Sequence, residues 1–202
     1  MSQGLTSGEL GNNTHIPVRS MLIALGGNLT SSVGTPRETL TAALKFMQTS
    51  GAVIRAISPF YHTPAFPAGA GPDYVNGAVR IEAPWTPAQA LAVLHRIEAK
   101  FGRERTQRWG QRTLDLDLLA VDGIVMPDRN THKIWRDLPL EAQIGRTPDQ
   151  LILPHPRLQD RAFVLVPLAD VAPDWVHPLL KMPVRAMLDA LPERDRAAVR
   201  RM

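Results

Sequence analysis

The sequence TLDLDLLAV occupies residues 113–121, and its first half alternates between leucine and aspartate. Successive side chains of a β-strand point to opposite faces of a sheet. We therefore expect a strand that buries its leucines on one face and presents Asp115 and Asp117 together on the other. The Cα atoms of two residues at this spacing lie about 6.6 Å apart, so the stretch predicts a pair of neighbouring carboxylates.

Segments upstream of this strand predict the rest of the fold. Three more strands are expected from apolar runs bounded by turn residues, over residues 21–25, 52–58 and 74–81. Two helices are expected to begin at Thr35-Pro36 and Thr86-Pro87 and to end at Gly51 and Gly102. The order strand–helix–strand–strand–helix–strand predicts a ferredoxin-like α+β fold, a split βαβ sandwich with a mainly antiparallel sheet and helices packed on it.

The chain is expected to divide into three parts. Residues 1–20 are polar and predict a flexible N-terminal extension, and residues 21–180 form the folded domain. Within that domain, residues 127–150 are charged and show no periodicity, so we expect an irregular insertion there. Residues 181–202 predict a last helix followed by a basic tail.

Composition narrows the function classes. The 202 residues are 44% hydrophobic and 21% charged, which suits a single globular domain. Cysteine is absent, which excludes a disulfide framework, an iron–sulfur cluster and a thiolate nucleophile. No stretch approaches the roughly 20 apolar residues of a membrane span, and the start does not resemble a secretory signal, so we expect a cytoplasmic protein. A net charge of +4 favours anionic partners.

Four arginines and a tryptophan lie just upstream of the two aspartates; they are Arg103, Arg105, Arg108, Arg112 and Trp109. Two close carboxylates repel each other unless a cation lies beside them, and hard oxygen ligands suit Mg²⁺, which also takes phosphate oxygens. Guanidinium groups neutralise the charge of a phosphate chain. The combination favours a metal–triphosphate site. A solvated acidic face beside a basic surface loop stays open as an alternative at this point.

A second group of side chains suits a planar ligand. Tyr74 and Asn76 point the same way along their expected strand, and an aromatic ring beside an amide fits a flat heterocycle with donors and acceptors on one edge. Phe163 could supply the other side of a stack. His155 lies between two prolines and could approach phosphate. A P-loop motif is absent.

Six segments in one order resemble a known family; they are ALGGNL (24–29), SPFYHTP (58–64), PDYVN (72–76), RWGQRTLDLD (108–117), LPHPR (153–157) and RAFVL (161–165). Together they resemble the 6-hydroxymethyl-7,8-dihydropterin pyrophosphokinases of folate biosynthesis. The resemblance implies a monomeric enzyme that transfers diphosphate from ATP to the hydroxymethyl group of the pterin, giving AMP and the pterin diphosphate. It also implies two Mg²⁺ ions and mobile loops.

The same resemblance implies roles for individual residues. The catalytic residues would be Arg103, Arg112, Asp115 and Asp117, and the two aspartates would also hold the metal ions. The pterin would be bound by Thr63, Pro64, Phe66, Tyr74, Asn76 and Phe163. The ATP-binding residues would be Glu98, Arg105, Trp109, Leu118, His155 and Arg161.

Two other functions use the same residues. A ferredoxin-like module could stack single-stranded RNA on Tyr74 and Phe163 and hold its phosphates with the arginines, without catalysis. Such a module would not need Asp115 and Asp117, which would repel the nucleic-acid backbone. A metal-dependent phosphatase or nucleotidyl transferase would need both acids, but not the aromatic pair.

Overall fold

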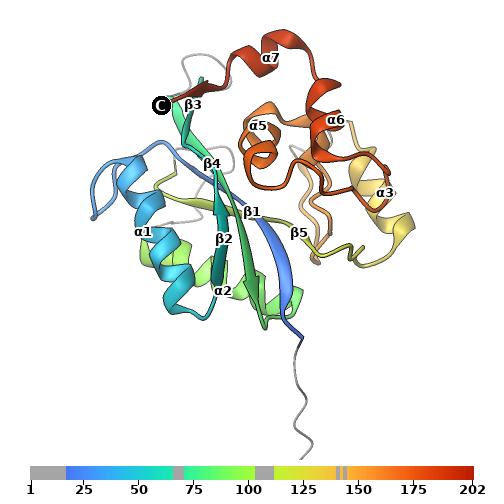
Figure 1. Ribbon diagram of the computed structural model, residues 1–202, viewed down its shortest axis with the longest axis horizontal. Coiled ribbons are helices and arrows are strands. Elements are labelled where there is room, and N and C mark those ends of the chain that lie inside the picture. Colours follow the sequence, from blue (N-terminus) through green and yellow to red (C-terminus); the bar gives the residue numbers. More distant parts are fainter. Residues whose placement is uncertain (1–16, 66–70, 103–111, 140–141, 143–144) are drawn as a thin grey trace, which may run out of the picture.

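The computed structural model describes residues 17–65, 71–102, 112–139, 142 and 145–202 (Figure 1). Its elements surround one sheet of six strands, which are β1 (Arg19–Gly27), β2 (Val53–Ile57), β3 (Tyr61–Thr63), β4 (Tyr74–Ala83), β5 (Asp115–Val121) and β6 (Arg200–Arg201). The strand order is β5-β1-β4-β3-β6, with β2 also paired to β4, and every pair is antiparallel. The expected α+β class and antiparallel sheet are therefore confirmed.

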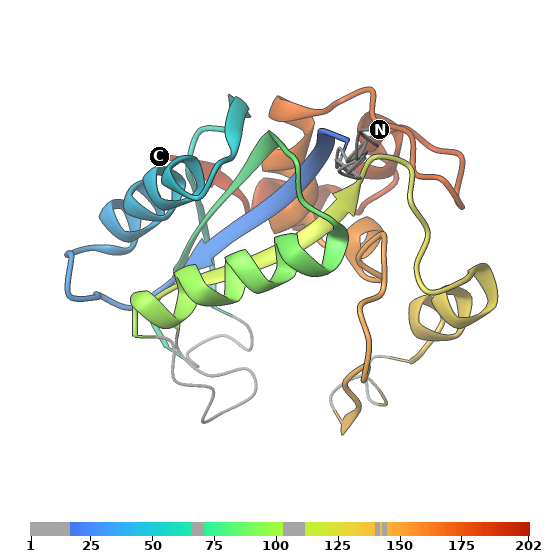
Figure 2. The same ribbon diagram turned by 90° about the horizontal axis from the view of Figure 1, so that it is seen from below.

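Helices cover both faces of the sheet. On one face lie α1 (Pro36–Thr49) and α2 (Pro87–Lys100), and Figure 2 shows α2 running along this face. On the other face lie α5 (Ala162–Val171) and α6 (Val184–Asp189), preceded by the 3₁₀ turn Leu158–Asp160. Two further helices are α3 (Arg129–Arg136) and α7 (Glu193–Ala197). Within the described part of the chain, no helix is long and apolar enough to cross a membrane.

The two long helices begin where the sequence predicts. Thr35 caps α1, and Thr86 caps α2 with a complete capping box in which its hydroxyl accepts from the backbone N–H of Gln89 at 3.2 Å. The side chain of Gln89 accepts in return from the backbone N–H of Thr86 at 2.8 Å. Each box satisfies donors that the first turn of a helix leaves unpaired.

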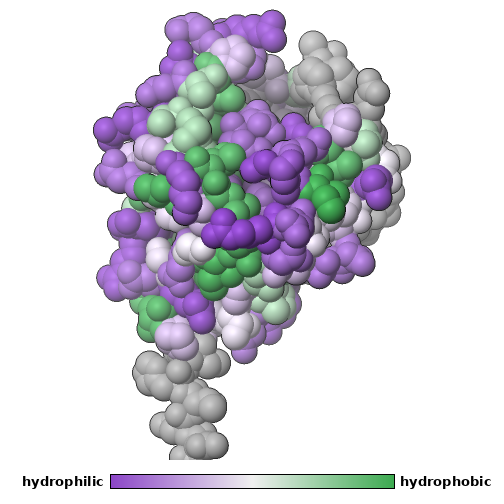
Figure 3. Space-filling model, turned by 90° about the vertical axis from the view of Figure 1, so that its right-hand side faces the viewer, coloured by the Kyte–Doolittle hydropathy of each residue, from purple (hydrophilic) through white to green (hydrophobic). Residues whose placement is uncertain are grey.

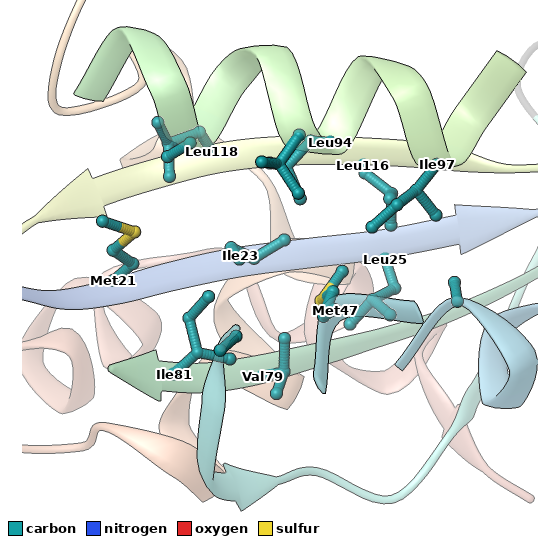
Figure 4. Close-up of a cluster of buried hydrophobic side chains, with 14 of the residues drawn as sticks. Met21, Ile23, Leu25, Met47, Val79, Ile81, Leu94, Ile97, Leu116 and Leu118 are labelled. Carbon is teal, nitrogen blue, oxygen red and sulfur yellow. The ribbon is translucent and has the colours of Figure 1, made fainter. Parts of the chain in front are cut away.

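The core has two layers because the strands alternate. Met21, Ile23 and Leu25 of β1 pack toward α1 and α2, together with Leu116 and Leu118 of β5 (Figure 4). Residues of the opposite parity, such as Leu22 and Ala24, face α5 and α6. The expected burial of the β5 leucines is thus confirmed, and Asp115 and Asp117 lie on the sheet face that carries α5.

The structure corrects three local expectations. The segment 127–150 was expected to be irregular but contains α3, whose N-cap Asp128 accepts from the backbone N–H groups of Asn130 and Thr131. No strand was expected between residues 58 and 74, but Tyr61–Thr63 forms β3. The expected last helix is α6, and the basic tail after it contains two elements that were not expected, α7 and the strand β6, which pairs with β3.

The side of the molecule that carries α3 and α6 is the right-hand side of Figure 1. Figure 3 shows this side as hydrophilic surface interrupted by separate hydrophobic patches. Most apolar residues of α5 and α6 are buried in the second core layer, between these helices and the sheet.

Candidate active site

Three strands place an acid, a glycine and an amide in one row. Asp115 of β5 lies opposite Gly26 of β1, and Gly26 in turn lies opposite Asn76 of β4. Residues directly opposite each other in an antiparallel sheet point to the same face. A Cβ atom on Gly26 would lie 3.0 Å from Asn76 Oδ1 and 4.0 Å from Asp115 Cβ. The glycine therefore keeps open the space between the carboxylate and the amide.

The second aspartate extends this acidic end of the sheet. Asp117 lies opposite Ala24 of β1, on the same face as Asp115, and both aspartates are half-buried. Two carboxylates at this spacing provide the hard oxygen donors that Mg²⁺ prefers, and Mg²⁺ takes its other ligands from phosphates and water. Within the described residues, no group of three or more histidine, cysteine, aspartate or glutamate side chains could hold a metal ion. The donor set fits Mg²⁺ bound by few protein oxygens.

The aromatic end of the row lies beside the acids. Asn76 Nδ2 donates a hydrogen bond to Thr63 Oγ1, and Thr63 lies opposite Tyr74 in the β3–β4 register. The pKa of Tyr74 is raised, mainly by burial. The charge of Arg112 acts to lower this pKa and the charge of Asp115 acts to raise it, so the phenol lies within electrostatic reach of both side chains. The structure therefore brings Thr63, Tyr74 and Asn76 together near the acidic end of the row. Pro64 follows directly after Thr63.

Arg112 joins the two ends of the site. Its guanidinium donates to Asp115 Oδ2 at 2.5 Å. Burial lowers the pKa of Arg112, but the charges of Asp115 and Asp117 and the hydrogen bond to Asp115 outweigh this, so its pKa is raised and the group stays charged. Its cation offsets the repulsion between the two carboxylates.

Asn28 holds Arg112 in position and was not predicted as a site residue. Its side chain is 6% exposed, its Oδ1 accepts from the Arg112 backbone N–H at 2.8 Å, and its Nδ2 donates to the Pro72 carbonyl at 3.0 Å. Its own backbone N–H donates to the Arg112 carbonyl at 2.9 Å. One asparagine thus ties the segment before β5 to the segment before β4. Asn28 lies in the ALGGNL segment of the family resemblance, but the Gly-Gly-Asn motif is too short to indicate a role for it by itself.

A third group approaches from the start of α5. Burial lowers the pKa of Arg161, and this outweighs the negative charges of Asp117 and Asp115, which act to raise it. Desolvation and the charge of Arg161 lower the pKa of His155 to about 3, so this imidazole is neutral at pH 7. The Arg161 guanidinium lies 5.7 Å from the ring centroid of Phe163, which is 40% exposed. Arg161 and His155 therefore lie within electrostatic reach of the acids, and Phe163 lies beside Arg161.

Two predicted ATP-binding residues do not present their side chains there. Glu98 of α2 is 2% exposed, and its Oε1 accepts from the Leu116 backbone N–H at 2.8 Å. Leu118 packs in the core on the α2 side, as Figure 4 shows. An ATP contact from Leu118 would have to use its backbone. Four other predicted site residues lie outside the described residues; they are Phe66, Arg103, Arg105 and Trp109.

The fold and this site define a ferredoxin-like α+β transferase domain with acidic, basic and aromatic side chains at one end of its sheet. More particularly, the chain belongs to the 7,8-dihydro-6-hydroxymethylpterin-pyrophosphokinase (HPPK) family, whose model matches residues 22–173. The family expected from the sequence is therefore confirmed, and it favours the enzyme over the RNA-binding alternative.

Individual relatives agree with this assignment. A 2-amino-4-hydroxy-6-hydroxymethyldihydropteridine pyrophosphokinase of Synechocystis is 37% identical over 158 residues, covering 78% of this chain and 68% of the relative. The enzyme of the same name from Haemophilus influenzae is 37% identical over 157 residues, covering 77% and 83%. The predicted enzyme class is the one that these relatives carry in their names.

Solved structures agree at the level of the fold. Wild-type HPPK-DHPS of Plasmodium falciparum matches with a TM-score of 0.61 at 15% identity over 86% of this chain. This chain spans 44% of the length of that structure, which is therefore the larger protein. At this identity the match supports the ferredoxin-like fold alone.

Proposed function

We propose that this protein transfers a diphosphate group from ATP to 6-hydroxymethyl-7,8-dihydropterin and releases AMP and the pterin diphosphate, as a step of folate biosynthesis. One observation carries the proposal. Asp115, Gly26 and Asn76 stand in a single row across three strands, so the acidic end that would bind phosphate and the aromatic end that would bind the pterin share one face of the sheet. Family membership supports the same reaction.

The pterin would lie at the β3–β4 end of the row. Tyr74 and Phe163 would stack on its two faces, while the Asn76 amide and groups of Thr63 and Pro64 would bind its edge. The amide is oriented in advance by its hydrogen bond to Thr63. Phe66 is proposed to line the same pocket. These contacts would direct the hydroxymethyl group toward the carboxylates.

ATP would lie over the acidic end. Asp115 and Asp117 would hold two Mg²⁺ ions, which would neutralise phosphate charge and align the β-phosphorus with the hydroxyl. Arg112 and Arg161 would balance the remaining negative charge, and the neutral His155 would offer a hydrogen bond to a phosphate oxygen without adding charge. Arg103, Arg105 and Trp109 are proposed to complete the nucleotide site. We propose a monomeric, cytoplasmic enzyme.

A product assay tests the reaction class. Purified protein is given ATP, Mg²⁺ and the hydroxymethyl dihydropterin, and the nucleotide products are separated. We expect AMP and the pterin diphosphate in equal amounts, with no formation when the pterin is omitted. ADP as the product, or no turnover in a protein that binds single-stranded RNA in a salt-sensitive way, would refute the proposal.

A further inference from the structure

Helix α3 contacts the segment that carries His155 through a buried histidine. His132 is 0% exposed, and its Nε2 lies 2.8 Å from the Pro154 carbonyl oxygen. A carbonyl can only accept a hydrogen bond, so Nε2 carries the hydrogen. Pro154 directly precedes His155, whose own backbone N–H donates to the Leu119 carbonyl at 2.8 Å. The turn at Pro154–His155 is thus held by a hydrogen bond from α3 to Pro154 and by a hydrogen bond from His155 to β5.

A second buried histidine supports the first. His177 is also 0% exposed, and its Nδ1 accepts from the backbone N–H groups of Leu179 and Leu180, both at 3.2 Å. Its hydrogen therefore lies on Nε2 in the neutral ring. The rings of His132 and His177 meet edge to face, with centroids 5.9 Å apart and planes at 70°.

The two rings have complementary open atoms. Among the described residues, neither His132 Nδ1 nor His177 Nε2 has a hydrogen-bond partner. In these tautomers His132 Nδ1 can only accept a hydrogen bond and His177 Nε2 can only donate one. Both tautomers belong to the neutral imidazole. Desolvation lowers the pKa of each, and Arg136 at the end of α3 lowers both further, while Asp137 raises that of His132. Both histidines are therefore neutral at pH 7.

We infer that His132, supported by His177, is a positioning residue that fixes the Pro154–His155 turn at the phosphate end of the site. This inference rests on the proposed function, because it takes His155 as a phosphate-contacting group. It gives α3 a role in shaping the nucleotide site, through the contact of His132 with the Pro154 carbonyl.

The test compares two substitutions at one position. His132→Phe keeps a ring of similar shape but removes the N–H, whereas His132→Gln keeps an N–H donor toward Pro154. One lost hydrogen bond of about 1 kcal/mol corresponds to about fivefold in an equilibrium constant. We expect His132→Phe to raise the KM for ATP about fivefold and leave the KM for the pterin unchanged, and we expect His132→Gln to recover most of the loss. Ile134→Ala, at an exposed residue of the same helix, is the control and should match wild type.

The outcomes separate the inference from the proposed function. If wild-type protein forms no AMP, the proposed function fails and the inference fails with it. If wild type forms AMP but His132→Phe keeps the wild-type KM for ATP, only the inference is overturned. An equal change in both KM values would mean a general structural role and would also overturn it. Should His132→Phe not fold, His132→Leu, which also removes the N–H, takes its place. Its effect on the KM for ATP must disappear in a His155→Ala background, and an effect that persists there would overturn the inference.

Discussion

Replacing Asn28 by alanine is expected to loosen two segments of the site at once. The substitution removes the acceptor for the Arg112 backbone N–H and the donor to the Pro72 carbonyl, but it leaves the backbone bonds of residue 28 in place. Arg112 then loses one of the contacts that hold its guanidinium beside Asp115. We expect lower stability and slower turnover from the same change.

The expected magnitude follows from the burial of the partners. A buried group left without its hydrogen bond costs about 1–3 kcal/mol. Arg112 is half-buried, whereas Pro72 is exposed and its carbonyl can bind water instead. We therefore expect the free energy of unfolding to fall by about 2 kcal/mol, near the lower end of the range for two bonds. If Arg112 contacts a phosphate as proposed, its displacement would cost about 1.5–3 kcal/mol, which corresponds to a decrease in kcat of roughly 10- to 150-fold.

The assay pairs urea unfolding with steady-state AMP formation, and Asn28→Asp is the matched variant. Aspartate keeps an oxygen that can accept from Arg112 but loses the donor to Pro72. It should therefore retain more activity than Asn28→Ala. If Asn28→Ala unfolds at the wild-type urea concentration and turns over at the wild-type rate, Asn28 does not position Arg112, and the account of this end of the site is wrong.

Four further predictions test other parts of the structure. Asp117→Asn should abolish AMP formation at every Mg²⁺ concentration while the exposed control Asp174→Asn stays active, and an unchanged Mg²⁺ titration would refute the metal site. Tyr74→Ala should raise the pterin KM about tenfold through lost stacking, and an equal rise in the ATP KM would contradict the pocket. Gly27→Ala places a Cβ atom 2.7 Å from a backbone carbonyl oxygen and should cost about 1–3 kcal/mol in urea unfolding; wild-type stability would show that this contact relaxes freely. The pKa of His177 is lowered from 6.5 to about 4, so the unfolded chain takes up the proton first and stability should fall between about pH 6.5 and 4, by up to about 3 kcal/mol; unfolding midpoints that do not change over this window would refute it.

Local patterns were enough to predict most of the fold. The alternation of leucine and aspartate fixed both faces of β5, and the Thr-Pro pairs fixed the starts of α1 and α2. Helix α3 was missed because among its residues only His132 is buried, so the segment shows no apolar period. Strand β6 was missed for a different reason. It has two residues and forms by pairing with β3, far away in the sequence, which no local pattern can indicate.

The site was predictable where the chemistry lies within one strand and less so where it depends on tertiary contacts. Strand parity alone indicates that Asp115 and Asp117 share one face of their strand, and that Tyr74 and Asn76 share one face of theirs. Asn28 could not be found in this way, because its partners are 44 and 84 residues away. Leu118 shows the opposite case: the resemblance assigned it to ATP, while the alternation of its own strand already placed its side chain in the core.

The end of that alternation explains how His155 reaches the site. The β1–β5 register shifts after Leu118, so Leu119 has no partner on β1, and Leu119 and Ala120 both pack toward α5 and α6. Such a bulge leaves one residue out of the ladder and bends the strand. The carbonyl of Leu119 accepts instead from the backbone N–H of His155. Strand β5 thus presents Asp115 and Asp117 from its regularly paired part and binds the backbone of His155 through the bulge at Leu119. A change that removed the bulge would displace His155 without altering either carboxylate.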